Sequence, residues 1–379
     1  MEKKKPAYST KMLEKPTKTV EPLKKPPWNP FERITQEDLL VFTRQLHTLL
    51  NAGVHMVKAF DTLAGQIDKE AMHRMLFRIN TRIKTGFTLS KALNEYPEVF
   101  NQIYVGIIRT GEAHGDLPLV LENLEQFLER EVNIKKRIAN ASVYPLFALA
   151  VCLLFALFTF KYILPNFVKF FQNMQVSLPL PTRIMIFLTE IVDNPFFVVA
   201  GLVLGGFLMF ALKRFSLSAR GKYVIDQASL SFPYFGELAK KICIVRFTNS
   251  LCTLLEGGVE LRKALELAGK ASGNSVYEQS VASITSSIKE GMDLATGFGT
   301  HRNLFGGMFP SMIRVGEESG ELPVVLRKLS HLYEQDVESS LGSLSVLIEP
   351  FLILFTGVII GFIIIAVFLP LYALLQKLG

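Results

Sequence analysis

The sequence predicts an all-α membrane protein with two repeated six-helix bundles on the cytoplasmic side and three transmembrane helices. Only 20% of its 379 residues are charged, below the typical value of about 25%, and the mean hydropathy is +0.30. A ten-residue motif occurs twice. Apolar residues recur at three- and four-residue spacing, with few alternating β-branched runs, which favours helices over strands.

The repeated motif shows that one module was duplicated. Residues 109–118 read RTGEAHGDLP and residues 314–323 read RVGEESGELP. The two copies are 205 positions apart, and the same offset aligns Phe42 with Phe247 and Gly53 with Gly258. An internal repeat of this length indicates two copies of one structural unit.

The first module begins with a helix-capping pattern. Thr35 can accept a hydrogen bond from exposed backbone N–H groups, and Asp38 favours the positive end of the helix dipole. Glycines at 53 and 86 are suited to end helices. The apolar residues on one face of the first helix are Leu39, Phe42, Leu46, Leu49 and Leu50. Six helices are expected over residues 34–142, the last one beginning after the repeated motif.

Three apolar runs are long enough to cross the roughly 30 Å hydrocarbon core of a bilayer. They cover residues 143–164, 195–212 and 346–370. Cations cluster before the first run and after the second, so the positive-inside rule places both of those ends in the cytoplasm. Because both modules end in a span, one further span must return the chain. The N-terminus is then cytoplasmic and the C-terminus extracytoplasmic.

The expected division of the chain follows from these runs. The expected parts are a disordered basic Pro-rich tail (1–33), a first repeat (34–165) with its bundle (34–142) and span (143–164), a short extracytoplasmic loop (166–194), a second span (195–212), a cytoplasmic linker (213–234), a second repeat (235–370) with its bundle (235–345) and span (346–370), and a C-terminal tail (371–379).

The net charge of +7 does not indicate a nucleic-acid partner, because it is concentrated in the tail. Residues 1–30 hold eight lysines against three glutamates, together with six of the 18 prolines. This composition predicts a disordered tether. It is either a solvated tail or a segment attracted to anionic lipid headgroups. It lacks the apolar core of a secretory signal.

The sequence lacks the usual signatures of catalysis. No GxxxxGK[ST] loop is present, so nucleotide phosphates would not be held in that way. The six histidines show no HExxH spacing, and Cys152, Cys243 and Cys252 form no CxxC pair, which predicts buried apolar fillers instead of a metal or disulfide site. We therefore expect no enzyme, no cofactor and no metal.

The doubled modules resemble a known family. Their starts read FTRQLHTLLNAGV and FTNSLCTLLEGGV, and GEAHGDLP and GEESGELP stand before their last helices. These features are similar to the GspF/PilC family, the inner-membrane platform proteins of type II secretion and type IV pilus machines. The resemblance covers nearly the whole chain after the tail. One departure is Asn249, where the first module has Arg44, so the two bundles need not make identical contacts.

The resemblance implies a set of partners. They are a hexameric cytoplasmic ATPase, pilin or pseudopilin subunits, other inner-membrane subunits of the machine, membrane lipid and further copies of this chain in a homo-oligomer. The implied location is the bacterial inner membrane. Pilus assembly, secretion and DNA uptake all remain open.

The mechanical hypothesis is that the ATPase moves the bundles and the spans then lift a pilin out of the bilayer. The candidate coupling residues lie in the repeated motif. They are Arg109, Gly111, Glu112 and Gly115 in the first copy, and Arg314, Gly316, Glu317 and Gly320 in the second. The alternative is structural: the glycines permit left-handed helix ends, prolines suit a first helical turn, and acids complement a helix N-terminus.

Three competing functions stay open at this point. A small membrane transporter would need charged residues along the middle of its spans, and these runs have none there. A membrane-anchored enzyme would need a nucleophile and base that the sequence does not display. A membrane-anchored scaffold of another envelope machine would share the architecture without the pilin and ATPase partners.

Overall fold

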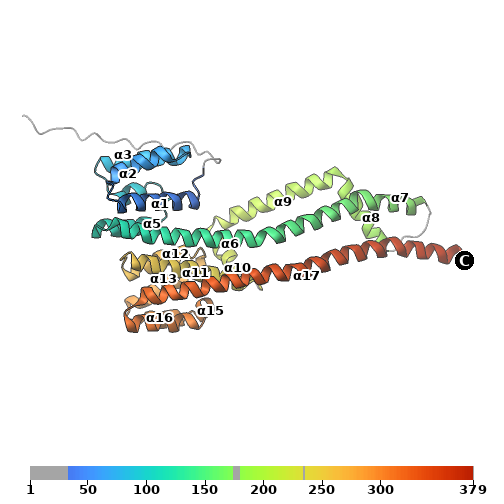
Figure 1. Ribbon diagram of the computed structural model, residues 1–379. Helices are drawn as coiled ribbons and strands as arrows, with labels where there is room; N and C mark the ends of the chain where they lie inside the picture. Colours follow the sequence, from blue (N-terminus) through green and yellow to red (C-terminus); the bar gives the residue numbers. More distant parts are fainter. Residues whose placement is uncertain (1–32, 174–179, 234, 379) are drawn as a thin grey trace, which may run out of the picture.

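The computed structural model describes residues 33–173, 180–233 and 235–378. Helices account for the fold of these residues, and no strand occurs among them. Two helical bundles lie side by side at one end, and long helices extend from them in one direction (Figure 1). Apart from Arg33, the predicted basic tail lies outside the described residues.

The first bundle has the six helices that the sequence predicts. They are α1 (Gln36–Asn51), α2 (Met56–Gln66), α3 (Glu70–Lys84), α4 (Leu89–Leu93), α5 (Gln102–His114) and the first part of α6 (Leu117–Phe158). Thr35 and Asp38 form the predicted capping box. Gly53 and Gly86 end their helices with φ of 79° and 93°, a backbone conformation that glycine adopts without a steric penalty.

The second bundle repeats this order with one addition. It contains α11 (Phe235–Glu256), α12 (Leu261–Ala271), α13 (Ser275–Lys289), α14 (Leu294–Gly299), α15 (Arg302–Phe305), α16 (Met308–Ser319) and the first part of α17 (Leu322–Leu378). The four-residue helix α15 makes this more than the expected six. It forms because both Phe305 and Gly306 donate to carbonyls four residues earlier, whereas Asn101, the counterpart of Gly306, caps α5 instead.

Each repeat ends in one continuous helix that contains both the last bundle helix and the apolar run. α6 runs unbroken through Pro145 for 42 residues, and α17 runs for 57 residues. After α6, a π-helical turn, η2 (Thr159–Ile163), leads into α7 (Leu164–Asn173). Pro165 cannot donate to the carbonyl four residues earlier, and its ring would crowd that carbonyl, so a wider turn is favoured here.

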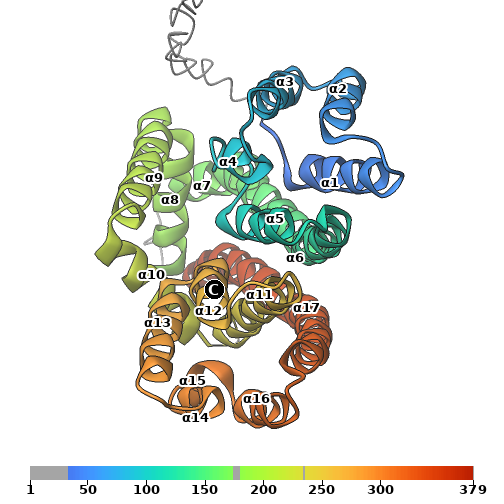
Figure 2. The same ribbon diagram turned by 90° about the vertical axis from the view of Figure 1, so that its left-hand side faces the viewer.

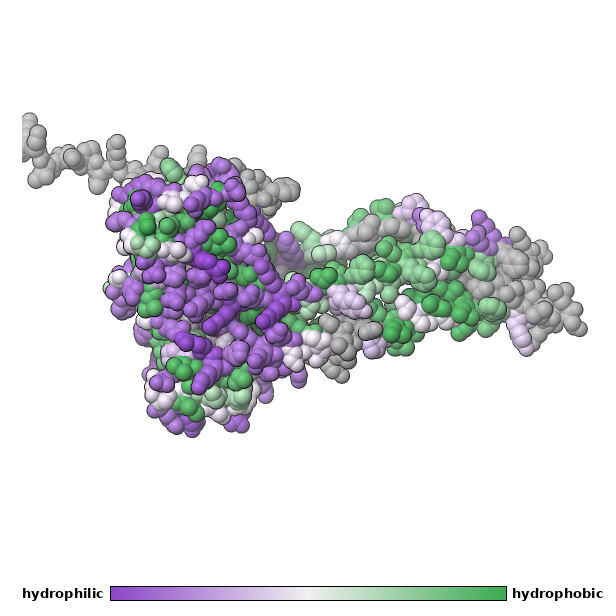
Figure 3. All heavy atoms as spheres, in the orientation of Figure 1, coloured by the Kyte–Doolittle hydropathy of each residue, from purple (hydrophilic) through white to green (hydrophobic). Residues whose placement is uncertain are grey.

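Two helical segments are long and apolar enough to cross a membrane. They are Leu117–Phe167 and Pro195–Ser216, whose most apolar windows have mean hydropathies of 2.4 and 2.3. The third apolar stretch, Pro350–Ala366, is shorter, and it lies within α17. Figure 3 shows hydrophobic residues over the extended helices and mostly hydrophilic ones over the bundles. The structure therefore supports two of the three predicted spans by length and composition, and the third stays a prediction.

The segments expected as a loop, a linker and a tail are largely helical. Residues 166–194 contain most of α7 and all of α8 (Leu180–Asp193), α9 (Pro195–Ser216) is followed by α10 (Ala219–Ser231), and α17 continues to Leu378. α8 packs against α17, where the buried Thr182 hydroxyl donates to the Ala366 carbonyl at 2.8 Å. Pro181 lies in the first turn of α8, a position that tolerates proline.

A single hydrophobic core joins the two bundles. Its buried side chains come from α1 to α6 and from α10 to α17 without a break between the repeats. In each bundle a phenylalanine of the first long helix anchors aromatic contacts: Phe42 with Phe60 and Phe100, and Phe247 with Phe298 and Phe305. The two repeats therefore form one packed unit.

Candidate functional site

Both copies of the repeated motif lie at the end of the molecule opposite the apolar helices (Figure 1). The sequence indicated a turn, but most of each motif is helical. Arg109, Gly111 and Glu112 occupy the last turns of α5, and Arg314 occupies the same place in α16. Only the residues from Gly115 onward, and from Gly320 onward, form the turn itself.

The first glycine of each motif permits close helix packing. A Cβ atom on Gly111 would lie 2.8 Å from Val120 Cγ2, and one on Gly316 would lie 3.0 Å from Leu322 Cδ1 and 3.1 Å from Leu322 Cα. Any larger residue would push the helix away from the start of the next one. These glycines therefore set how closely α5 meets α6 and α16 meets α17.

The glutamate of each motif caps the short helix of its own bundle. Glu317 accepts from the backbone N–H groups of Leu294 and Ala295 at 2.7 and 2.9 Å. Glu112 accepts from the backbone N–H of Ser90 at 3.2 Å. α14 and α4 have only six and five residues, too few to be stable alone, so a carboxylate at their exposed N–H groups stabilises them.

The second glycine of each motif ends its helix in the left-handed conformation, as the structural alternative predicted. Gly115 has φ of 78° and Gly320 has φ of 71°. Asp116 then accepts from the Leu119 N–H at 3.2 Å and begins α6. The motif is thus a helix end, a turn and a new helix, all fixed by contacts within the chain.

The two arginines of the motif have exposed side chains. Arg109 and Arg314 lie at the surface of α5 and α16. Arg314 is close enough to Asp293 for its positive charge to affect the pKa of that carboxyl group. The side-chain and backbone hydrogen bonds from Thr296 lower the pKa of Asp293, and the positive charge of Arg314 lowers it further.

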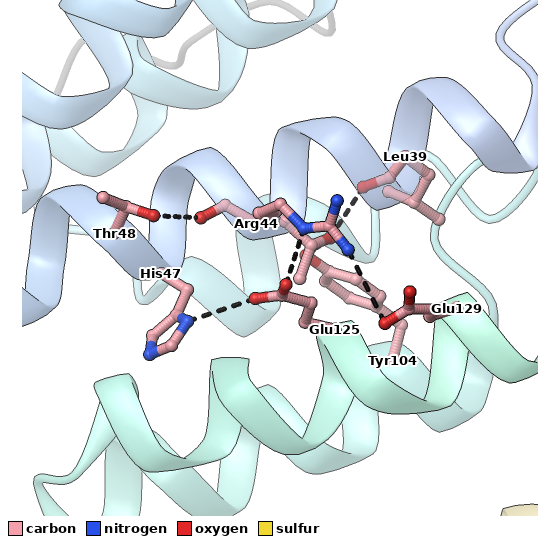
Figure 4. A network of polar contacts seen from close by, with 8 residues as sticks. Leu39, Arg44, His47, Thr48, Tyr104, Glu125 and Glu129 are labelled. Atoms are coloured by element: carbon pink, nitrogen blue, oxygen red, sulfur yellow. Dashed lines mark hydrogen bonds and ion pairs between the residues drawn. The ribbon is translucent and has the colours of Figure 1, made fainter.

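A polar network on the first bundle was not predicted as a site (Figure 4). Arg44 Nε donates to Glu125 at 2.6 Å, Arg44 also pairs with Glu129 at 3.6 Å, and His47 Nδ1 lies 3.2 Å from Glu125. Partial burial raises the pKa of Glu125, but the hydrogen bonds from Arg44 and His47 outweigh this and hold it below its usual value. The network fixes α1 against α6.

The departure of the second repeat from this network has a structural cause. Asn249 takes the place of Arg44 and is fully buried, with its side-chain amide donating to Glu334 at 2.9 Å. Ser330, the counterpart of Glu125, also contacts Asn249. A buried position favours the neutral amide over a guanidinium. The same helix position is therefore surface in one repeat and interior in the other.

The cysteines and histidines build no reactive centre in the described part of the chain. Within it, no group of three or more His, Cys, Asp or Glu side chains could hold a metal ion. Cys243 and Cys252 are buried, as predicted, and burial raises the pKa of each thiol to about 12. Such thiols stay protonated and unreactive at neutral pH.

The fold thus defines a class: a helical protein made of two fused repeats, each ending in a long helix that becomes apolar, with two candidate membrane spans. The family described as Type II secretion system (T2SS), protein F matches residues 42–165 and 247–370. The chain belongs to this family, the GspF/PilC family.

Relatives from both kinds of machine are similar over most of their length. The type IV pilus assembly protein PilC of Thermus thermophilus is 33% identical over 343 residues, 90% of this chain and 84% of that protein. PilC of Myxococcus xanthus is 31% identical, covering 91% and 82%. The type II secretion system protein F of Pseudomonas aeruginosa is 29% identical, covering 91% and 85%. These names describe assembly and secretion, and none of them describes a catalysed reaction.

Proposed function

We propose that this chain is an inner-membrane assembly platform that couples a cytoplasmic ATPase to the extraction of pilin or pseudopilin subunits. Both bundles lie in the cytoplasm, three spans cross the membrane, and the C-terminus is extracytoplasmic. The α7–α8 segment lies at the far end of the spans. The relatives support both a pilus and a secretion role, and the proposal covers either one.

One observation carries the coupling mechanism. The exposed Arg109 and Arg314 lie at the tip of the molecule, and the motif at each tip leads directly into α6 or α17. Both helices are continuous from the tip into apolar sequence. A helix transmits a displacement along its axis better than a jointed loop does, because each turn is held by backbone hydrogen bonds. Force applied at the tip would therefore reach the membrane-spanning part.

The glutamates of the motif have a different part in the proposal. Since Glu112 and Glu317 cap α4 and α14, they hold the tip in shape. We assign contact with the ATPase to the arginines and support of that surface to the glutamates and glycines. Each arginine would pair with an acidic side chain of the ATPase.

The test is a pair of variants that leave the caps intact. We expect Arg109→Ala/Arg314→Ala to reduce copurification of the ATPase from membranes and to abolish filament output or secretion, at unchanged protein level. Arg220→Ala is the matched control, since Arg220 is an exposed arginine on α10, away from the tip. If ATPase recovery and output stay normal in the double variant, the coupling role of the tip is wrong. If neither an ATPase nor a pilin-like protein copurifies with the unaltered chain, the platform function itself fails.

A further inference from the structure

The two repeats contact each other through different faces. The first repeat contributes α5 and α6, and the second contributes α11, α12 and α17. A Cβ atom on Gly257 would lie 3.3 Å from Ile107 Cγ2, and one on Gly258 would lie 3.3 Å from Thr110 Cγ2. Arg130 donates to Asn249 at 3.4 Å, and Arg137 pairs with Glu338. An interface between two unlike faces of similar units is heterologous.

Because the repeats are copies of one module, each carries both faces and uses only one. The face that the second repeat uses is exposed in the first. Asn249 and Thr253 are buried, whereas their counterparts Arg44 and Thr48 are exposed. Gly53, the counterpart of Gly258, has open space where a Cβ would be.

The face that the first repeat uses is likewise exposed in the second. Phe127 is 4% exposed, but its counterpart Leu332 is 42% exposed. Ile134 is buried, but its counterpart Ser339 is exposed. Val315 is the counterpart of Thr110, which contacts Gly258 in the interface between the repeats, and it is 53% exposed.

The two unused faces are turned toward the same side of the molecule. Viewed nearly along the long helices, α1 and α2 form the right-hand edge of the first bundle, and α16 and α17 lie at the lower right of the second (Figure 2). α8, α9, α10 and α13 lie on the opposite side and leave both faces uncovered (Figure 2). α6 and α17 run in the same direction (Figure 1), so the operation that relates the repeats preserves the direction of the spans.

We propose that a second copy of this chain occupies these faces: the α16–α17 face of one copy packs against the α1–α2 face of the next, and the copies close into a ring around the axis of the long helices. Repeating a heterologous contact gives either a ring or an open fibre. Because the two unused faces of a copy are turned toward the same side of the molecule, successive copies curve toward one another, which favours a closed ring over a fibre. This inference deepens the proposed platform function, because it assigns the contact between its copies.

The side chains of the two unused faces fit this contact. By the repeat relation, Val315 of one copy meets Gly53 of the next, and Met312 meets Ala52. Small residues opposite large apolar ones permit close helix approach, as Gly257 does beside Ile107. Arg44, which already pairs with Glu125 and Glu129, faces Gln335 by the same relation. The contact therefore rests mainly on apolar packing.

Disulfide cross-linking in membranes tests the contact and its direction. Chains with Ala52→Cys and chains with Met312→Cys, carrying different tags and both with Cys152→Ala, are produced together in one cell. We expect cross-linked dimers that contain both tags, since a disulfide needs the two Cβ atoms about 3.5–4.5 Å apart. A chain that carries both Ala52→Cys and Met312→Cys should give a series of cross-linked oligomers, the largest of which contains as many copies as the ring. The in-chain pair Ile107→Cys/Gly257→Cys is the positive control, and Phe77→Cys with Met312→Cys is the mismatched pair.

Other cross-linking patterns would overturn the proposal. Dimers with Ala52→Cys alone, or with Met312→Cys alone, would show a symmetric contact between like faces. Absence of mixed dimers while the in-chain control cross-links would show that the faces do not meet.

A second variant probes the apolar part of the contact. Val315→Asp should reduce the mixed dimer at least fivefold, whereas Val224→Asp, at an equally exposed valine of α10, should not change it. Equal yields in the two variants would contradict the assigned contact. Filament output and secretion are not readouts here, so a chain that cross-links as expected but supports neither process would refute the platform function and leave the ring standing.

Discussion

Replacing Gly111 by alanine should loosen the joint between α5 and α6. The added Cβ would lie 2.8 Å from Val120 Cγ2, 3.0 Å from its Cβ and 3.1 Å from its Cγ1. Ordinary carbon contacts are about 3.5–4.0 Å, so α5 must move by roughly half an ångström or more against a β-branched side chain with restricted rotamers. Overpacking of this kind costs about 1–3 kcal/mol. For a chain of 379 residues each kcal/mol lowers the midpoint of thermal unfolding by about 1–1.5 °C.

The assay is thermal unfolding of the purified full chain in detergent, followed by circular dichroism. Gly111→Ala should lower the midpoint. The same substitution should lower it less when it is made in the Val120→Ala protein, because the smaller side chain leaves room for the new methyl group. A favourable coupling of about 0.5–3 kcal/mol is expected for residues in direct contact. Unchanged stability of Gly111→Ala, or additive effects in the double variant, would refute the close-packing explanation of the motif glycine.

Three further outcomes follow from the contacts of the carboxylates. Glu317→Ala should cost more stability than Glu112→Ala, by about 1 kcal/mol, because two backbone N–H groups lose a charged acceptor in α14 and one loses it in α4; equal losses in denaturant titrations would contradict this. The pKa of Glu125 is lowered in the folded state, so its contribution to stability is present above the unfolded value of about 4.3 and is lost as the pH falls through the folded value. Glu125→Gln should therefore flatten the loss of stability as the pH falls below about 4.3, and an unchanged acid profile would exclude it as a contributor. Burial raises the pKa of Glu131, Arg246 offsets this in part, and Glu334 adds to it. Stability should accordingly fall as the pH rises from about 4.3 through the raised value, and Glu131→Gln should remove this fall, which titration of the two proteins under matched conditions would detect.

Much of the fold could be predicted because the signals are local. The capping box at Thr35, the left-handed glycines at 53 and 86 and the helix periods of the first bundle each depend on residues within about four positions of one another. The helical content of residues 166–194 was not predicted, because the segment was described only as a loop between two spans. A long helix leading from the repeated motif into the first apolar run was expected, and α6 continues unbroken through Pro145.

The local structure of the repeated motif could be predicted only in part. The spacing of Gly111, Glu112 and Gly115 marked a helix end, and the structure confirms the left-handed glycine. The partners of the other two residues come from elsewhere in the chain. Glu112 reaches α4, which lies 22 positions earlier, and no spacing rule indicates which N–H groups it would meet. The coupling role of Arg109 and Arg314 stays a proposal.

The sequence by itself determined the duplication, the positions of most helix ends in the bundles and the apolar runs, because the repeat offset, the glycines and the hydropathy are properties of neighbouring or aligned residues. Only the tertiary structure decided which face of each repeat is buried. Arg44 and Asn249 occupy the same position of one module, yet the first is half exposed and the second is fully buried. The difference arises because the repeats pack through unlike faces, and burial then favours a neutral side chain at Asn249.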